Sequence, residues 1–297
     1  MRKGILKNKS LKLNILKSSF SINKILNVNK KLLIHLFLIA GAFIMIIPFL
    51  WMLSTSLKTQ NEVFRYPPNW IPTIPQWKNY LEIYKYFPFL RYTLNTLKIT
   101  LIVTVGQLFT CSLAGYSFAR IKFPGKNFLF LIYIASLMIP FFTIIVPQFA
   151  IMKYLGWIDT HTALIVPSLA NAFGTFFFRQ FYLTFPRELE DAARIDGCNP
   201  FQIYYKIFLP LSKPAIASLS VFTFMGVWND FLWPLVILSS KHKKTLTIGL
   251  AYLKGQHAID WPCLMAGSVL SLLPIIILFL FLQKYFVKGI TLSGTKM

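Results

Sequence analysis

Charged residues are scarce in this chain, and acidic residues are the scarcest of all. Only 13% of the 297 residues are charged, and only nine are Asp or Glu. A soluble domain carries about 25% charged residues. Hydrophobic residues make up 56% of the chain and aromatic residues 16%. This balance excludes an ordinary water-soluble protein and favours one whose main solvent is the lipid bilayer.

The sequence also lacks the short motifs that carry catalysis or metal binding. A phosphate-binding P-loop needs GxxxxGK followed by Ser or Thr. The single Gly-Lys pair, Gly125-Lys126, precedes Asn127 and has no glycine five residues before it. There is no HExxH or GxSxG motif, and the three cysteines form no CxxC pair. The sequence therefore predicts no enzyme, no metal and no cofactor in this chain.

Long apolar runs are abundant, and six of them reach the roughly 20 residues that a membrane helix needs. They cover residues 32–57, 93–119, 127–151, 161–184, 214–239 and 264–287. The first run is too long for a signal-peptide core and lacks a cleavage site, so we expect it to remain as a membrane helix. The predicted fold is an all-α integral membrane protein, with a basic tail at 1–31 and a domain of six transmembrane helices at 32–297.

The surplus of basic residues predicts how the chain lies in the membrane. The net charge is +22, and no nucleic-acid-binding motif accompanies it, so anionic lipid is the expected counter-charge and nucleic acid is not an expected partner. Twenty of the 31 basic residues fall on one side, in 1–31, 120–126, 179–213 and the C-terminal end. The positive-inside rule then predicts a multi-pass protein with both termini in the cytoplasm. The cluster Lys241, Lys243 and Lys244 is an exception to it. Tail 1–31 fits either a helix on the membrane surface or a disordered basic arm.

The loop from about 186 to 214 differs in composition from its surroundings. Four of the nine acidic residues lie in Glu188–Asp196, where they suit the N-terminus of a short helix. Gly197 is placed to end that helix with positive φ. Asn199-Pro200 predicts the cap and first turn of a second helix. The pattern predicts a helix–turn–helix on the cytoplasmic surface, which is either a docking site for another protein or an ordinary amphipathic connector.

The spacing within this loop resembles a known family. Asp191-Ala192-Ala193 is followed by three residues, Gly197, nine residues, Ile207, one residue and Leu209-Pro210. This is similar to the EAA loop of ABC importer permeases, EAA-x3-G-x9-I-x-LP, with Asp in place of the first Glu. Further stretches resemble the MalG-like branch of carbohydrate permeases. They are Leu94–Leu97, Tyr116–Arg120, Arg187–Glu190, Val227–Phe231, Leu273-Pro274 and Gln283–Gly289.

The resemblance implies a function that composition alone does not give. It implies a type I ABC importer permease fold with a cytoplasmic coupling helix, in the inner membrane of a bacterium. The implied partners are a sister MalF-like permease, two ATPase subunits that hold the ATP and Mg, and an extracellular solute-binding protein. The implied substrate is a carbohydrate, an oligosaccharide in particular. The residues implied to contact the ATPase are Glu190, Asp191, Ala192, Ala193, Asp196 and Gly197.

Asp230 is the one acidic residue deep in a predicted span, and such residues are functional candidates. Aromatic faces and hydrogen-bonding side chains are what a sugar path requires. The candidate path residues are Asn95, Trp228, Asn229, Asp230 and Trp233. The alternative is that Asp230 braces the helices or pairs with Lys98. Two other functions also remain: import of a non-sugar solute such as glycerol phosphate or amino acids, and ion-coupled secondary transport through Asp230.

Overall fold

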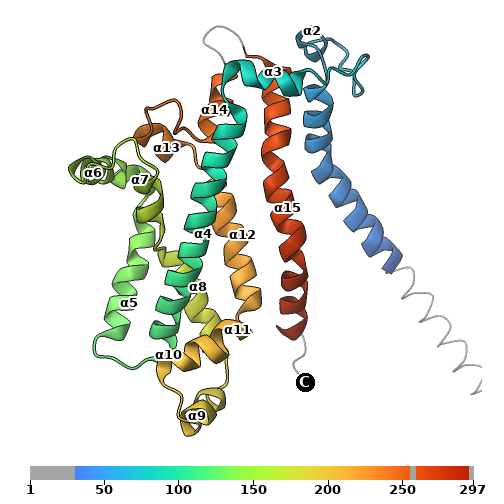
Figure 1. Ribbon diagram of the computed structural model, residues 1–297. Helices are drawn as coiled ribbons and strands as arrows, with labels where there is room; N and C mark the ends of the chain where they lie inside the picture. Colours follow the sequence, from blue (N-terminus) through green and yellow to red (C-terminus); the bar gives the residue numbers. More distant parts are fainter. Residues whose placement is uncertain (1–30, 255–258, 294–297) are drawn as a thin grey trace, which may run out of the picture.

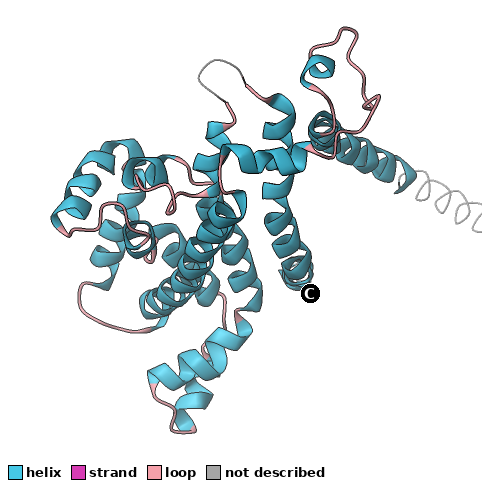
Figure 2. Ribbon diagram, turned by 45° about the horizontal axis from the view of Figure 1, so that its top comes forward, coloured by secondary structure: helices cyan, strands magenta, loops and turns pink. Residues whose placement is uncertain are grey.

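The computed structural model describes residues 31–254 and 259–293, with side chains as far as Tyr285. Throughout these ranges the regular structure is helical (Figures 1 and 2). The predicted basic tail lies outside the described residues except for Lys31, and so does the C-terminal segment 294–297. An all-α architecture is therefore confirmed.

Three helices are long and apolar enough to cross a membrane unaided. They are Lys31–Ser56, α4 (Phe89–Arg120) and the Trp261–Tyr285 part of α15 (Trp261–Ser293). They confirm the predicted segments 32–57, 93–119 and 264–287. The described part of the chain has up to five spans if each of two sharply bent helix pairs counts as one. The number of six spans stays a prediction.

Segment 127–151 is not the single straight helix that its apolar run predicts. Helix α5 (Lys126–Ala135) continues into a 3-10 turn at Ser136–Met138, and α6 (Phe141–Tyr154) then leaves at 103°. The bend follows from Pro140, because a proline pushes the residue before it out of the helical region. Ile139 accordingly has φ −85° and ψ 115°. Hydropathy records the apolar length of a segment and not its direction.

The fourth and fifth predicted segments are also interrupted. Segment 161–184 holds α7 (Thr162–Ile165), a 3-10 turn (Val166–Ser168) and α8 (Ala172–Leu183). Segment 214–239 holds α12 (Lys213–Trp228) and α13 (Leu232–Ile237).

The remaining elements gather at the two ends of the bundle (Figure 1). At one end lie α2 (Gln60–Val63), α3 (Asn79–Tyr86) and α14 (Leu246–Tyr252). At the other end the loop between α8 and α12 forms α9 (Glu188–Ile195), α10 (Pro200–Ile203), a π-helix (Tyr204–Phe208) and α11 (Leu209–Leu211).

Helix α4 runs through the centre of the bundle and packs closely on α8. A Cβ atom added at Gly115 would lie 2.6 Å from Phe178 Cβ and 2.9 Å from the backbone nitrogen of Arg179. Only glycine allows this approach, so any larger residue would push the two helices apart. The apolar core at this end joins α4, α8 and the α9–α11 loop around Tyr116, Phe178, Tyr182 and Phe208.

Helix Lys31–Ser56 leans away from the bundle (Figures 1 and 2). None of its most apolar stretch is buried by the other residues that the structure describes. Lipid or a second protein must cover this surface, because an apolar helix of this length is not stable in water.

Candidate functional site: the loop between α8 and α12

Helix α9 stands at the tip of the loop, further from the bundle than any other labelled element at its end (Figure 1). Glu188, Glu190 and Asp191 lie in its first turn, where negative charge stabilises the free backbone N–H groups. The predicted short acidic helix is present.

The end of α9 confirms the role predicted for Gly197. Gly197 has φ +79°, and its N–H bonds to the Arg194 carbonyl at 3.0 Å. The Cys198 N–H bonds to the Ala193 carbonyl at 2.9 Å. Together these two bonds form a Schellman motif, which needs a left-handed residue at this position. The glycine therefore fixes the angle at which the chain leaves α9.

The second predicted helix also begins where the sequence indicates. The Asn199 side chain accepts a hydrogen bond from the Gln202 N–H, and the Gln202 side chain accepts one from the Asn199 N–H. This reciprocal pair is a capping box, and Pro200 occupies the first helical position. Both turns of the loop are thus held by hydrogen bonds of its own.

The residues predicted to contact a partner divide into two groups. Glu190 and Ala193 are buried at 6% exposure each and face the chain's own helices. The other four are exposed: Asp191, Ala192, Asp196 and Gly197. The sequence reasoning missed Ile195, which is 86% exposed. Its position two residues before Gly197 gives no sign of this, because an isoleucine in an amphipathic pattern normally indicates a buried face.

Glu190 is held inside by a basic residue that the sequence reasoning also missed as part of the site. Its Oε1 lies 3.2 Å from Arg120 Nε, and the two side chains are only 9% and 7% exposed. Arg194 Nη2 lies 3.7 Å from the other carboxylate oxygen. Nε and Oε1 are not aligned for a hydrogen bond, so the contact between them is electrostatic, and the other contacts of the two side chains must help to offset the desolvation cost of burying the pair. Arg120 was visible in the sequence as a cytoplasmic basic residue, but its partner lies 70 positions away and no local pattern joins them.

The two tryptophans proposed for the substrate path are enclosed by the chain's own helices. Trp228 is 1% exposed, and its indole N–H bonds to the Ser271 carbonyl on α15 at 3.0 Å. Trp233 is 4% exposed and bonds to the Ala163 carbonyl on α7 at 3.1 Å. Both indole rings are packed and hydrogen-bonded between the chain's own helices, and this geometry favours a structural role for them over the predicted role in the substrate path.

Asn229 and Asp230 lie at the break between α12 and α13. Asn229 is exposed, and its amide nitrogen bonds to the Met225 carbonyl at 2.9 Å. Asp230 is partly exposed, and its backbone carbonyl accepts a bond from Thr247 at 2.7 Å. Among the described residues no ion pair joins Asp230 to Lys98.

A recess of about 250 Å³ opens beside α12, on the side that carries Phe222, Thr223 and Gly226. Its lining combines amide, hydroxyl and aromatic side chains: Gln107, Asn171, Phe173, Phe222, Thr223 and Gly226 are among them. Gly226 faces open space, with nothing within 4 Å of an added Cβ atom. Asn229 is one turn away from Gly226, so the exposed polar candidate and the recess share one side of α12.

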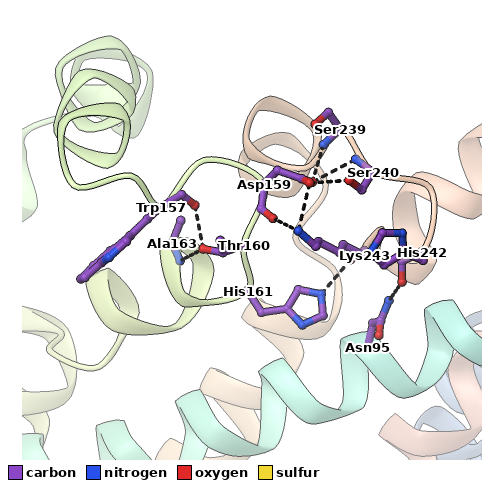
Figure 3. A network of polar contacts seen from close by, with 10 residues as sticks. All are labelled: Asn95, Trp157, Asp159, Thr160, His161, Ala163, Ser239, Ser240, His242 and Lys243. Carbon is purple, nitrogen blue, oxygen red and sulfur yellow. Dashed lines mark hydrogen bonds and ion pairs between the residues drawn. The ribbon is translucent and has the colours of Figure 1, made fainter.

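Asn95 belongs to a polar network at the opposite end of the molecule (Figure 3). Its amide nitrogen donates to the carbonyls of His242 at 3.0 Å and Lys244 at 2.9 Å. The His161 ring contacts the Lys243 carbonyl at 2.8 Å. These bonds fix the segment after α13 against α4, which is a different role from the substrate contact proposed for Asn95.

Asp159 is the centre of this network, and it has φ +57°. Its carboxylate accepts bonds from the Ser239 N–H at 3.0 Å, the Ser240 N–H at 2.9 Å and Lys243 Nζ at 3.1 Å. Partial burial acts to raise the pKa of Asp159, but the hydrogen bonds from Ser240, Lys243 and Ser239 outweigh it and hold the pKa well below its ordinary value of 3.8. The ion pair offsets the charge of Lys243, one of the basic residues that depart from the predicted charge asymmetry.

No group of three or more His, Cys, Asp or Glu side chains within the described residues is placed to hold a metal ion. The geometry therefore consists of a protruding helix–turn–helix at one end, a polar network at the other, and a recess between them.

Comparison with known proteins defines the class to which this arrangement belongs. Residues 111–292, more than half of the chain, match the family described as the inner membrane component of binding-protein-dependent transport systems. The chain belongs to this family of membrane permeases.

Several relatives cover almost the whole chain. The chain is 39% identical over 261 residues to the arabinooligosaccharide transport permease AraQ of Halalkalibacterium halodurans, covering 86% of this chain and 92% of the relative. It is 35% identical over 265 residues to the sn-glycerol-3-phosphate transport permease UgpE of Pectobacterium atrosepticum, covering 86% and 94%.

A solved bacterial ABC transporter that imports the acidic polysaccharide alginate contains a chain of the same fold. The TM-score is 0.73 at 23% identity, with 89% of this chain and 97% of that chain covered. The all-α permease fold and the membrane location are therefore established.

Proposed function

We propose that this chain is one of two permeases in an ATP-driven importer of carbohydrate, an oligosaccharide in particular. The observation that carries the proposal is α9, a short helix that protrudes from the bundle with Asp191, Ala192 and Ile195 exposed. Ile195, which is 86% exposed, adds an apolar contact beside the exposed acidic residue of this protruding helix, and the combination supports docking of another protein. Membership of the binding-protein-dependent family supports an ATPase as that protein.

The proposed partners follow from two features of this chain: it has no P-loop, and it leaves an apolar helix uncovered. It has no P-loop, so ATP and Mg bind in two separate ATPase subunits, each docked on one coupling helix. Helix Lys31–Ser56 leaves its apolar surface uncovered, which supports contact with a sister permease as well as lipid. An extracellular binding protein delivers the substrate to the end opposite α9.

The proposed orientation has α9 and both termini in the cytoplasm. The positive-inside count supports it, and the C-terminal end of α15 lies at the same end as α9 (Figure 1). The ion pair with Asp159 offsets the charge of Lys243, which is one of the basic residues that do not fit this orientation. The polar network around Asp159 then lies on the outer surface.

The carbohydrate substrate is supported by the relatives that transport arabinooligosaccharides and lactose, at 39% and 32% identity. The relative that transports sn-glycerol-3-phosphate, at 35% identity, keeps that solute as a second candidate. Membership of a binding-protein-dependent family speaks against an ion-coupled carrier that uses Asp230.

The test is to purify the chain with the permease, ATPase and binding protein encoded beside it, and to measure ATP hydrolysis in lipid nanodiscs. We expect hydrolysis to be stimulated by the binding protein loaded with an arabinooligosaccharide or a related sugar. Stimulation by sn-glycerol-3-phosphate alone would contradict a sugar substrate but would still support an ATP-driven importer. A chain that purifies without any ATPase subunit would contradict both the sugar substrate and the importer.

A further inference from the structure

Three polar side chains follow one face of α4 at helical spacing. Each contacts a different part of the loop between α8 and α12, which we call the coupling loop. Ser112 Oγ lies 2.7 Å from the Tyr204 hydroxyl in the π-helix. The Tyr116 hydroxyl donates to the Pro200 carbonyl at 3.1 Å. Arg120 completes the series through its ion pair with Glu190 on α9. Because residues four apart share a helix face, the three contacts form one stripe.

Arg120 joins more elements than any other residue of this stripe. Besides Glu190, its Nη2 donates to the Tyr182 carbonyl at 2.6 Å and to the Phe185 carbonyl just after α8. Its guanidinium also lies over the Phe208 ring, 5.2 Å from the centroid. One planar side chain therefore connects the ends of α4 and α8 with α9 and the π-helix. A lysine has one charged nitrogen and cannot make these contacts together.

The opposite end of α4 is tied to the network of Figure 3. Asn95 donates to two carbonyls of the segment after α13, and Thr96 Oγ1 accepts a bond from the Leu246 N–H at 2.8 Å. Helix α4 has 32 residues and no proline within its bounds. At 1.5 Å per residue it spans about 48 Å. It therefore connects the coupling loop to the far surface without a break.

The covalent route from the loop into the membrane is bent by comparison. The segment Pro200–Leu211 meets α12 at 76°. The π-helix Tyr204–Phe208 and two prolines, Pro210 and Pro214, lie at this junction. These are the usual sites where a helix bends, because backbone hydrogen bonds are missing or shifted there. A force on α9 thus meets a bent joint toward α12 and a set of buried side-chain contacts toward α4.

We propose that the stripe Ser112, Tyr116 and Arg120 transmits movement of the coupling helix to the outer surface through α4, with Arg120 as the main positioning residue. Glu190 has the matching role, because it does not contact the ATPase but fixes α9 to α4. This inference rests on the proposed function. On this proposal the eight-residue helix α9 has two faces. The exposed face docks on the ATPase, and the buried face transmits movement to α4.

The experiment compares two variants with a matched control in the reconstituted four-subunit importer. Arg120→Lys keeps the charge and removes the planar fork. Ser112→Ala with Tyr116→Phe removes two hydroxyl groups and leaves the packing. The control is Arg179→Lys, because Arg179 donates to the Phe118 carbonyl and lies over the Phe130 ring, away from the coupling loop. For each, the amount of co-purified ATPase, the hydrolysis rate and the uptake of labelled arabinotriose, or whichever sugar stimulates the wild type, are measured.

Both transmission variants are expected to assemble with normal amounts of ATPase and to transport about fivefold less sugar per ATP, the lower range of measured coupling effects. The control is expected to keep the wild-type ratio. Should Arg120→Lys fail to assemble, the hydroxyl variant decides. A wild-type ratio in an assembled variant would overturn the inference while leaving the proposed function intact. An inactive wild-type complex would instead overturn the function.

Discussion

Glu190 and Asp191 are adjacent acidic residues of α9, but only Asp191 is exposed. The Glu190 side chain is 9% exposed and paired with Arg120, whereas Asp191 is exposed on the outer side of α9. A motif defined by residue type alone treats such neighbours as one patch. The structure separates them, because only one residue in every three or four returns to the buried side of a helix. We therefore propose the docking role for the exposed residues of the loop: Asp191, Ala192, Ile195, Asp196 and Gly197.

Gly197 offers the sharpest test at the residue scale, because the chain contains a matched control. Gly197 and Gly125 both have positive φ, +79° and +73°, and neither has an atom within 4 Å of an added Cβ. We expect Gly197→Trp to remain in the membrane but to lose sugar uptake, since the side chain blocks docking and strains the turn. Gly125→Trp carries the same strain without a docking face. Uptake assays in cells, with immunoblots for membrane level, measure both.

Normal uptake in the Gly197→Trp variant would contradict docking at this turn. Equal losses of uptake in both variants would show that strain alone is responsible.

Asp159 gives a prediction on pH. Because its pKa is lower in the folded protein than the ordinary 3.8, its contribution to stability is complete above that value and is lost as the pH falls below it toward the folded pKa. Asp159→Asn keeps a residue that tolerates positive φ but removes the charge. We expect about 1–3 kcal/mol of destabilisation at neutral pH. Thermal unfolding in detergent measures it, and a variant that matches the wild type at pH 7 would contradict the role assigned to this carboxylate.

At the scale of single elements, the coupling loop was the part most accessible to sequence reasoning. Its caps are local signals: an acidic first turn, a glycine at the end and an Asn-Pro start. The membrane segments were predictable in length but not in direction. The 103° bend after α5 depends on how Pro140 directs the chain. The 76° bend before α12 lies near Pro210 and Pro214, which the sequence shows, and a π-helix, which no sequence pattern predicts. The Arg120–Glu190 pair is a tertiary contact and left no local trace.

A substitution at Trp228 tests whether the aromatic residues of α12 stabilise the helix bundle or contact the substrate. The Trp228 ring stacks on Phe224 at 5.5 Å between centroids, and its N–H bonds to the Ser271 carbonyl. We expect Trp228→Phe to reduce the free energy of unfolding by about 1–3 kcal/mol, because a buried carbonyl loses its donor. The preference among sugars is expected to remain unchanged.

Trp77→Phe is the control for this change, because Trp77 is 68% exposed. It should leave both stability and sugar preference as they are. A Trp228→Phe protein of normal stability that accepts different sugars would place this ring in the path after all.

At the scale of the whole molecule, the orientation in the membrane can be tested directly. In a variant with Cys111, Cys198 and Cys263 replaced by Ser, a single cysteine at Asn61 or at Asp196 is offered a membrane-impermeant maleimide. Both positions are exposed. We expect labelling at position 61 in intact cells and at position 196 only after the membrane is opened. The reverse pattern would place α9 outside and remove the ATPase from consideration.

The molecule as a whole has the protruding helix α9 at one end, a polar network at the other, and α4 running between them (Figures 1 and 3). The most apolar stretch of helix Lys31–Ser56 is left uncovered by the described part of the chain. Both features fit the proposed assembly, in which a second permease and lipid cover the helix and an ATPase binds α9. In this proposal the chain forms one part of a transport path.

The most direct measurement is sugar uptake into sealed proteoliposomes that contain the complete complex, with ATP trapped on the side of α9 and the loaded binding protein on the other. We predict uptake that requires both ATP and the binding protein and that is unchanged when ionophores dissipate all ion gradients. Uptake driven by an ion gradient in the absence of ATP would contradict the account, and Asp230 would then be the residue to examine.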